Sequence, residues 1–564
     1  MKTLLRPFTL IELLVVIALC GFGKLGPFAL PRHKCRFRHW SLLVAMSLAA
    51  AADAYAQTAD SFVPGPNLGV DQFALQTDGK VLVGGQFGTL AGSSRKYIGR
   101  LNADGTLDAA FNSTAAVLCN GALAVQTTEA IWASGTFLSG AWLGSVVRLK
   151  DNGKLDTNCI TGADGYACAI LEQPDGRILL GGIFAKVGNQ TRNRLARLNA
   201  DGSLDQDFDP GADGTVYSLA LQPDGKIIVG GKFLTIAGAS EFNLARLYPD
   251  GSLDYDFSPN PNDAVTCITV QPDGKIDVGG WFSNVAGQQC HRLARLNPDG
   301  SFDSDFSENQ TSVWDAYSMA LQADGKLLVA GTLVDVERSV SFSIGRFNQD
   351  GSPDLQFQLN GKFNALAVAL QADGKILVGG SFEQLAGVGR TNLGRLYNTG
   401  PATEALSYDG TNITWLRGGT SPEVQWTNFA WSNDSTNWSD ACQGSRVPGG
   451  WQLAGIALPV GATLRARGLV AGGQYNGSSW IVESRTIVGR PSILINEGQS
   501  SYSADGFSFH ISGLKGQTVA IDASPDLSYW FPLSTNVLTA PVIQFLDPSP
   551  LPDGRRFYRL RLLE

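Results

Sequence analysis

The fold is decided by the stretch Leu221-Gln222-Pro223-Asp224-Gly225-Lys226-Ile227-Ile228-Val229-Gly230-Gly231. A second string follows it, Leu244-Ala245-Arg246-Leu247 and then Asp250-Gly251-Ser252-Leu253-Asp254. Both strings recur at intervals of 47 to 51 residues. The turn position of the first string is held, copy by copy, by Asp78, Thr128, Asp175, Asp224, Asp273, Asp324 and Asp373. Seven copies at a fixed period are the signature of a repeat protein.

Each copy predicts four short strands. In the fourth copy, Val216–Leu221 alternates into a Pro-Asp-Gly turn, and Lys226–Phe233 returns from it. After a loop, Leu244–Leu247 and Leu253–Phe257 flank an Asp-Gly turn, a strong hairpin signal because Gly accepts positive φ. Four antiparallel strands in about 49 residues make a propeller blade. The sequence therefore predicts an all-β chain with a seven-bladed β-propeller over residues 57–400.

The two ends of the repeat region predict how the ring closes. The seventh copy stops after its third strand, at Leu396-Tyr397-Asn398-Thr399-Gly400. Near the start of the region, Ser61-Phe62-Val63-Pro64-Gly65 matches Asp207-Phe208-Asp209-Pro210-Gly211 at the end of the third copy. We expect this first segment to complete the last blade. The match is partial, since Ala59 stands where the other copies have Asp.

These motifs resemble the delta-60 repeat family, whose copies have the form L-Q-P-D-G-K-I-L-V-G-G-x-F and R-L-x-x-D-G-S-L-D-x-x-F. The resemblance covers about residues 58–400. It implies a β-propeller in an exported bacterial protein and no established activity. The second copy departs most, because Thr127-Thr128-Glu129 replaces the Asp-Gly turn, and we expect its blade to be distorted.

After Gly400 the period disappears and short alternating segments continue. Residues 401–489 resemble the β-sandwich module that often follows such propellers, and 490–564 predict a second small β module. Tryptophan is concentrated here and has two interpretations: the core of a sandwich, or exposed rings that stack on sugars. The tryptophans concerned are Trp415, Trp426, Trp431, Trp438, Trp451, Trp480 and Trp530.

Residues 1–56 predict a targeting region. A basic run, the apolar stretch Trp40–Ala52 and Ala54-Tyr55-Ala56 indicate a secretory signal cleaved after Ala56. We expect a secreted, periplasmic or cell-surface protein, with no stretch long enough to span a membrane. An upstream stretch, Phe8–Ile17 with Glu12, resembles the start of type IV prepilins, although Pro7 stands where that family has Gly.

Composition excludes several chemistries. The net charge of −8 argues against a non-specific nucleic-acid binder. No cysteine or histidine spacing predicts zinc, and the adjacent Cys290 and His291 are poorly placed for a catalytic pair. The stretch Asn199–Asp205 resembles part of a calcium loop but lacks the acidic first ligand and the final Glu. We therefore predict no catalytic residue, metal or cofactor. Buried free thiols are favoured over disulfides for Cys119, Cys159, Cys168, Cys267, Cys290 and Cys442.

A repeated Arg lies eight residues before a repeated Asp, with an Asp-Gly turn between them. The two should face each other across the hairpin, where opposite charges contribute roughly 0.2–1 kcal/mol per pair. We interpret them as a structural ladder. Its members are Arg100 with Asp108, Arg148 with Asp156, Arg197 with Asp205, Arg246 with Asp254, Arg295 with Asp303, Arg346 with Asp354, and Arg395.

The connection between the second and third strands varies most among the copies, and a single asymmetric ligand needs such differences. We therefore predict a non-catalytic binding or adhesion protein, acting as a monomer, whose protein or glycan partner docks on that face. Neutral drift of exposed loops is the alternative origin of this variation. Two other functions stay open: glycan binding through the C-terminal tryptophans, and a polysaccharide hydrolase or lyase. The predicted binding residues are Arg192, Glu241, His291, Glu337 and Arg390.

Overall fold

The computed structural model describes residues 57–563. The gaps in this range are 114–115, 119–120, 139–141, 307–310, 336–339, 358, 360–363, 460, 490, 495–499, 504–505, 514–515, 526–528, 541 and 549–555. The described chain is all-β apart from one short 3-10 turn, η1 (Gln474–Asn476). None of its helices is long and apolar enough to cross a membrane. The predicted signal cleavage site and Glu337 lie outside the described residues.

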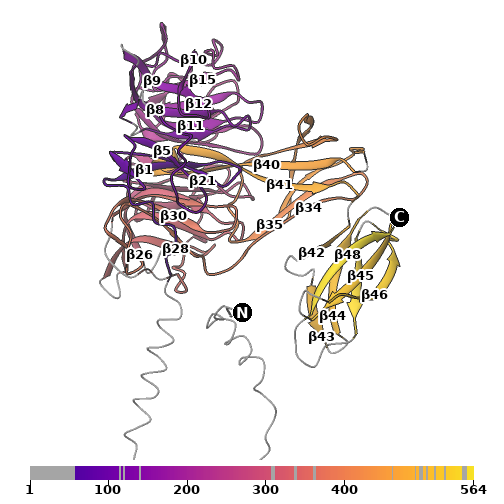
Figure 1. Cartoon of the computed structure of the whole chain (residues 1–564). Helices are drawn as coiled ribbons and strands as arrows, with labels where there is room; N and C mark the ends of the chain where they lie inside the picture. Colours follow the sequence, from indigo (N-terminus) through magenta and orange to yellow (C-terminus); the bar gives the residue numbers. More distant parts are fainter. Residues whose placement is uncertain are drawn as a thin grey trace, which may run out of the picture. The chain divides into compact units, whose positions relative to one another are not determined.

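Six three-stranded antiparallel sheets, and the blade 2 part of a nine-stranded sheet that continues into the sandwich, form the propeller (Figure 1). Blade 4 shows the pattern: β16 (Thr215–Leu221), β17 (Ile227–Lys232) and β20 (Leu244–Leu247) form a meander. Gly225 takes φ 84° in the first turn. The predicted fourth strand is reduced to a single bridge, Leu247 to Leu253, and four other blades have the same kind of bridge. Among the residues described, a fourth strand of more than one bridge occurs only in blade 2, where Leu155 and Ile160 pair with the third strand across an irregularity.

The other blades have these strands. Blade 1 has β1 (Val70–Leu75), β2 (Val81–Gly85) and β5 (Ile98–Leu101); blade 2 has β6 (Ala116–Leu118), β7 (Leu123–Val125), β8 (Ile131–Leu138), β9 (Trp142–Leu149) and β10 (Leu155–Ile160); blade 3 has β11 (Ala167–Glu172), β12 (Ile178–Gly182) and β15 (Leu195–Leu198). Blade 5 has β21 (Val265–Val270), β22 (Ile276–Gly280) and β25 (Leu293–Leu296); blade 6 has β26 (Thr311–Leu321), β27 (Leu327–Asp335) and β28 (Val340–Phe347); blade 7 has β29 (Asn364–Leu370), β30 (Ile376–Ser381) and β33 (Leu393–Leu396).

In five blades the second connection is itself a tiny hairpin of two-residue strands. Ala237 and Gly238 at the tip of one of them take φ 51° and 76°, the pair of positive angles that a type I′ turn requires. The five hairpins are β3 (Thr89–Leu90) with β4 (Ser93–Ser94), β13 (Lys186–Val187) with β14 (Gln190–Thr191), β18 (Thr235–Ile236) with β19 (Ala239–Ser240), β23 (Asn284–Val285) with β24 (Gln288–Gln289), and β31 (Gln384–Leu385) with β32 (Val388–Gly389).

The first strands of the blades form the inner ring around the axis, and β29 contacts β1 to close it. The N-terminal segment completes blade 7, as the matching motifs predict. Ala59 bridges to Leu396, and the amide of Tyr397 donates to the carbonyl oxygen of Thr58 at 3.0 Å. The predicted mismatch at Ala59 is made good by the next residue, because Asp60 supplies the carboxylate for Arg395.

The repeated Gly-Gly pair has two distinct steric reasons. At the first Gly a side chain would strike the next blade: a Cβ on Gly230 would lie 2.7 Å from Cδ1 of Ile268. At the second Gly it would strike the inner strand of the same blade: a Cβ on Gly231 would lie 2.2 Å from the carbonyl oxygen of Thr215. That close approach accompanies a β-bulge in β16, where the pairing shifts register between Val216 and Ser218. A bulge at the same place occurs in blades 1, 3, 5, 6 and 7.

The second blade, which lacks the Asp-Gly sequence, forms its first turn with a different residue at positive φ. Glu129 takes φ 63° where the other turns use Gly. Its carboxylate accepts a hydrogen bond from the hydroxyl of Thr77 in blade 1 at 2.8 Å. The turn therefore survives with a strained non-glycine residue that is held by a neighbouring blade.

Residues 401–489 form the predicted sandwich. One sheet has the order β34 (Ala402–Tyr408), β35 (Ile413–Gly419), β39 (Gly450–Leu453), β38 (Ser445–Val447). The other contains β37 (Ser439–Gln443), β36 (Thr427–Ser432), β40 (Thr463–Gly472) and β41 (Ser478–Ile487), and through β41 it pairs in parallel with β7 of blade 2. Four tryptophans are core residues that are at most 2% exposed, as the sandwich-core interpretation expects: Trp415, Trp426, Trp451 and Trp480.

The C-terminal module has two small sheets of its own. One joins β42 (Ser492–Leu494), β44 (Gly506–Ser512), β43 (Ser500–Ser503) and β47 (Val542–Asp547). The other joins β46 (Phe531–Val537), β45 (Thr518–Ser524) and β48 (Phe557–Leu563). Its buried core consists of Phe509, Ile511, Val519, Ile521 and Leu538, and the rings of Phe507, Phe545 and Tyr558 pack against it.

The hairpin of β40 and β41 leaves the sandwich and enters the centre of the propeller (Figure 1). Its tip, residues 472–479, makes polar or ring contacts with all seven inner strands. The partners, from blade 1 to blade 7, are Gln72, Leu123, Ile170, Tyr217, Ile268, Met319 and Val368. The channel that a propeller of this size would otherwise have is therefore filled by a segment from the following module.

Candidate functional site

The Arg–Asp ladder is present in all seven blades, with closest N–O distances of 2.5–2.8 Å. Six of the seven Arg side chains are less than 10% exposed, and Arg148 is 21% exposed. A second cation, from the first turn of the blade, also pairs with the ladder Asp. In blade 4, Nζ of Lys226 lies 3.0 Å from the carboxylate of Asp254. Hydrogen bonds and these cations hold the pKa of the Asp254 carboxyl below its usual range despite its burial.

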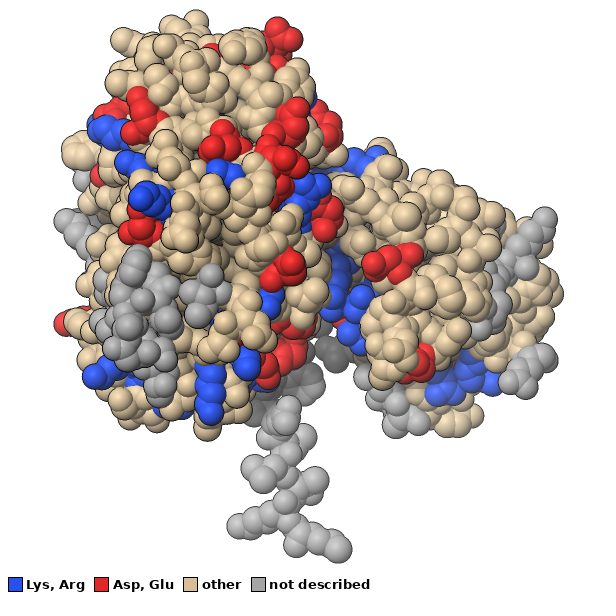
Figure 2. Space-filling model, turned by 90° about the horizontal axis from the view of Figure 1, so that it is seen from above, with Lys and Arg blue, Asp and Glu red and all other residues tan. Residues whose placement is uncertain are grey.

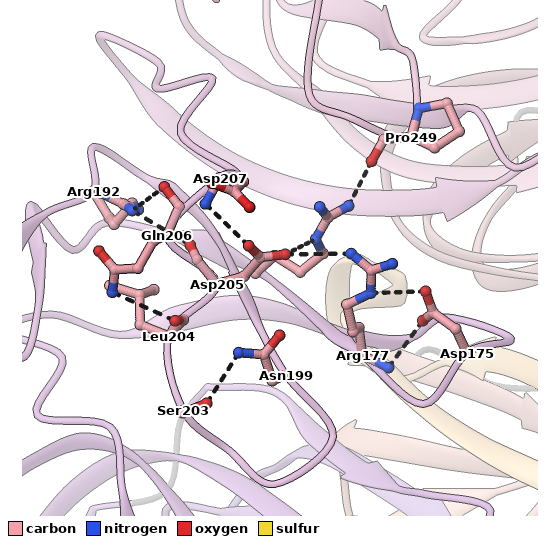
Figure 3. Close-up of polar contacts among 11 residues, drawn as sticks. Asp175, Arg177, Arg192, Asn199, Ser203, Leu204, Asp205, Gln206, Asp207 and Pro249 are labelled. Atoms are coloured by element: carbon pink, nitrogen blue, oxygen red, sulfur yellow. Dashed lines mark hydrogen bonds and ion pairs between the residues drawn. The ribbon is translucent and has the colours of Figure 1, made fainter.

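Each ladder Arg also donates to a residue of the next blade. Figure 3 shows one of these contacts, at the carbonyl oxygen of Pro249. Nη1 of Arg197 donates to the carbonyl oxygen of Pro249 in blade 4 at 2.5 Å, while its Nε donates to Asp205 at 2.7 Å. The guanidinium carbon lies 4.3 Å from the centre of the Phe208 ring. The ladder therefore clamps neighbouring blades together, a buried structural role that a simple surface pair would not have.

Two of the predicted binding residues are used inside the fold. Arg192 is 5% exposed, and its Nη2 donates to the carbonyl oxygens of Asp205 and Gln206 at 3.3 and 3.2 Å (Figure 3). Glu241, at the equivalent position of blade 4, is 6% exposed and accepts from the hydroxyl of Ser258 at 3.0 Å. Neither side chain is accessible to a docked partner.

The remaining predicted residues differ among themselves. Arg390 is half-buried and donates to the carbonyl oxygen of Asp60 at 2.5 Å, so it too fastens a connection to the blade edge. His291 is exposed at the second-connection face, which is the side of the propeller that carries the loops between second and third strands. Their positions in the sequence did not distinguish Arg192, Glu241 and Arg390, which hydrogen-bond within the fold, from the exposed His291.

The opposite side, which carries the first and third turns, is covered near the axis by the sandwich. The amide of Ala323 donates to the carbonyl oxygen of Ser421 at 2.8 Å. Nε1 of Trp426 donates to the carbonyl oxygen of Glu172 at 3.1 Å. The mouth of the channel on this turn face is therefore occupied by the sandwich, whereas the hairpin tip points toward the second-connection face.

The bulges of the inner strands lie at this second mouth, and the residue at the bulge differs from one blade to the next. The bulge residue stands seven positions before the first-turn Asp, and an equivalent position exists in every blade. The seven positions hold Asp71, Gly121, Cys168, Tyr217, Thr266, Tyr317 and Leu366. A bulge redirects a side chain and is over-represented beside binding sites. Asp71, Gly121 and Thr266 are buried, whereas Cys168, Tyr217, Tyr317 and Leu366 are partly exposed, and these four make the strongest candidate for a site.

Tyr475 from the hairpin tip lies at the centre of these bulge positions. Its ring centre is 5.1 Å from that of Tyr217, and Tyr217 in turn lies 6.1 Å from Trp281. Burial raises the pKa of the Tyr475 hydroxyl to about 12, and burial also raises the pKa of Tyr217 and of Tyr317. We call Tyr217, Trp281, Tyr317 and Tyr475 the mouth cluster; all four are partly buried.

Two carboxyls have strongly raised pKa values elsewhere. Burial raises the pKa of Glu172 to about 7 although Thr127 donates to it twice at 2.8 Å, and burial raises the pKa of Asp277 to about 6. Such shifts mark candidate catalytic groups when they lie in a cleft. Here the side chains are at most 2% exposed and their oxygens are engaged by neighbouring Thr or Gln groups.

The remaining chemistry-bearing groups are accounted for as follows. Among the described residues no disulfide joins Cys159, Cys168, Cys267, Cys290 and Cys442, but only Cys159 and Cys267 are buried as expected, and Cys442 is exposed. Cys119 lies outside the described residues. No group of three potential metal ligands occurs in the described part of the chain. The third-turn Asp201, part of the calcium-like stretch, accepts from the amide and hydroxyl of Ser203 at 2.9 and 2.7 Å, which is an ordinary turn. On the surface seen in Figure 2, acidic and basic side chains are interspersed.

Comparison with known proteins identifies the repeats. The chain carries six repeats of the domain described as "Domain of unknown function (DUF5122) beta-propeller", at residues 76–111, 173–208, 222–257, 271–306, 322–357 and 371–400. The second blade lies outside these matches. No curated protein matches the chain.

Two solved structures show weak likeness. A "Glycoside hydrolase" is 12% identical over 71% of this chain and 96% of its own, with a TM-score of 0.18. A Salmonella alpha-2-macroglobulin mutant is 12% identical over 70% of this chain and 33% of its own, with a TM-score of 0.11. Scores this low carry no argument about fold or function.

Proposed function

We propose that the protein is an exported, non-catalytic binding or adhesion protein of the delta-60 repeat type, whose second-connection face holds its partner at the mouth cluster. One observation carries the proposal: the bulge positions of the inner strands, which lie at that mouth, hold residues that differ from blade to blade. Binding one asymmetric partner requires differences among the blades, and the ladder residues supply none. The exposed His291 lies on the same face.

Export rests on the predicted signal cleaved after Ala56. The fold uses the chain directly after this point: Gln57 is 7% exposed, and Thr58 and Ala59 already pair with blade 7. A cleaved signal would leave every residue needed for ring closure in the mature protein. The structural use of Gln57 onward therefore supports the position of the cut.

Few of the C-terminal tryptophan rings are accessible for the alternative function, glycan binding. Four of the seven are core residues. The guanidinium carbons of Arg465 and Arg485 lie 3.8 and 5.2 Å from the ring centre of Trp438. That of Arg559 lies 4.5 Å from the ring centre of Trp530. A catalytic role would need unique carboxylates at an accessible site, and the two most perturbed ones are enclosed.

The experiment is a binding screen with the full chain, because cutting at Gly400 would remove the hairpin from the propeller. The chain is applied to an array of extracellular proteins and glycans, beside a Tyr217→Ala/Trp281→Ala variant. A matched control changes two exposed tyrosines elsewhere, Tyr255 and Tyr529, which are 73% and 68% exposed. Binding lost in the mouth variant and kept in the control supports the proposal; equal binding by all three chains contradicts it.

A further inference from the structure

The tip of the channel hairpin is held in a conformation that its residues do not favour. Tyr475 has φ 61° and Asn476 has φ 49°. A bulky residue is an outlier in this left-handed region, whereas Gly and Asn adopt it readily. Strained residues persist where surrounding structure fixes them, and they cluster at ligand-binding sites.

The surrounding structure that fixes the tip is the propeller itself. Oδ1 of Asn476 accepts from the amide of Met319 at 2.7 Å, and its amide nitrogen donates to the carbonyl oxygen of Ile268 at 3.2 Å. Asn476 is buried, so these bonds explain why Asn is there. They do not explain Tyr475, because a Gly at that position would make the same turn without strain.

Tyr475 contributes a partly exposed ring to a row of three aromatic side chains. Tyr475, Tyr217 and Trp281 come from the hairpin, from blade 4 and from the chain after β22 of blade 5. Their rings meet at 47° and 63°, so successive faces are presented at different angles. Aromatic side chains of this kind offer apolar faces together with a hydrogen-bonding tip.

The cation beside the row is already paired. Lys232, whose Nζ lies 5.8 Å from the Trp281 ring centre, is paired with Asp263 at 3.2 Å. Two carboxyl groups also lie near the cluster: Asp71, whose pKa is raised by burial, and Asp315, which interacts with the hydroxyl of Tyr317. Because Lys232 is paired and both carboxyls would repel an anion, the row does not suit an anionic ligand; apolar faces and hydroxyl groups match the rings and the tyrosine hydroxyls.

From this geometry we propose that the mouth cluster binds a neutral saccharide chain, stacked on Tyr475, Tyr217 and Trp281. The inference rests on the proposed function and gives the partner its chemical class. Apolar C–H faces of successive sugar units lie against the rings, and their hydroxyls exchange hydrogen bonds with the tyrosine hydroxyls.

The test uses the full chain on an array of neutral oligosaccharides (β-glucan, xylan, mannan and chitin fragments) with uronic-acid oligosaccharides and extracellular proteins alongside. Tyr475→Gly is the decisive variant, because it removes the ring and relieves the positive φ. We expect it to unfold no earlier than the original chain yet to bind the saccharide at least about tenfold more weakly. Tyr255→Ala is the matched control and should leave binding unchanged.

The outcomes separate this inference from the proposed function. Saccharide binding that survives both Tyr475→Gly and Tyr217→Ala overturns the inference. A protein or uronic-acid ligand lost in the mouth variants, with no neutral saccharide bound, overturns the saccharide class and leaves the second-connection face as the site. If Tyr475→Gly unfolds at a clearly lower denaturant concentration than the original chain while binding per folded molecule is intact, the ring serves stability. That result also overturns the inference.

Discussion

The carboxylate of Asp60 lies 2.6 Å from Nε of Arg395, a residue 335 positions later in the chain. This pair is the seventh rung of the ladder and the only rung among the seven that joins the two ends of the repeat region. Phe62 completes it, since the Arg395 guanidinium lies 4.6 Å from the centre of its ring. Ring closure and blade construction therefore use the same three groups.

Asp60→Ala should open the ring. Arg395 is 9% exposed and would be left as a buried charge without its partner. Breaking such a pair costs about 3–5 kcal/mol. Chemical denaturation measures the loss in the free energy of unfolding, with the exposed Asp207→Ala as the control. Equal stability of the two variants would show that closure does not depend on this rung.

Arg246→Ala should destabilise blade 4 by a similar amount and leave partner binding intact. The substitution removes the partner of Asp254 and the donor to the carbonyl oxygen of Pro298 in the next blade. The measurements are the denaturation midpoint and binding at a temperature where both chains are folded. Lost binding with an unchanged midpoint would contradict the structural role of the ladder.

Gly231→Ala should lower the free energy of unfolding by about 1–3 kcal/mol or more, because its Cβ would overlap the carbonyl oxygen of Thr215. The same strand bulge positions Tyr217, so partner binding should weaken as well. Gly389→Ala is the control, since a Cβ there meets nothing within 4 Å. A Gly231→Ala chain with original stability and binding would rule out the steric account of the Gly-Gly pair.

Much of this fold is predictable from sequence because its signals are local. The Asp-Gly turns, the alternating strands and the Arg–Asp spacing each lie within about one repeat, so periodicity alone assigns blades and ladder. The use of Asp60 in place of Ala59 was not predictable, since it depends on a one-residue shorter entry into blade 7. Nor does Gly473–Gly477 differ from an ordinary surface turn in its residues, although the structure places it in the channel. Of the mouth cluster, Tyr217 and Tyr317 stand seven residues before the first-turn Asp, a position where the residue type differs from blade to blade.

Glu172→Gln should stabilise the protein at neutral and alkaline pH. The pKa of Glu172 rises from 4.5 to about 7 in the folded chain, so its contribution is fully present below pH 4.5 and is lost as the pH rises through about 7. The loss is about 3 kcal/mol at most. Unfolding free energies of both chains from pH 4 to 8 check this, and the gap between them should widen with pH. A gap that is constant across this range would refute the raised pKa.

N-terminal sequencing of exported protein should find Gln57 as the first residue, following cleavage after Ala56. A chain that begins at Phe8 would instead favour the prepilin-like interpretation of the leader.

The most direct measurement is hydroxyl-radical footprinting of the full chain with and without the partner captured on the array. The mouth cluster and His291 should become protected, because the partner covers the second-connection face. Protection confined to the turn-face residues Asp201, Asp250 and Asp299, with Tyr217 and Tyr475 equally reactive in both states, would place binding on the opposite side of the propeller.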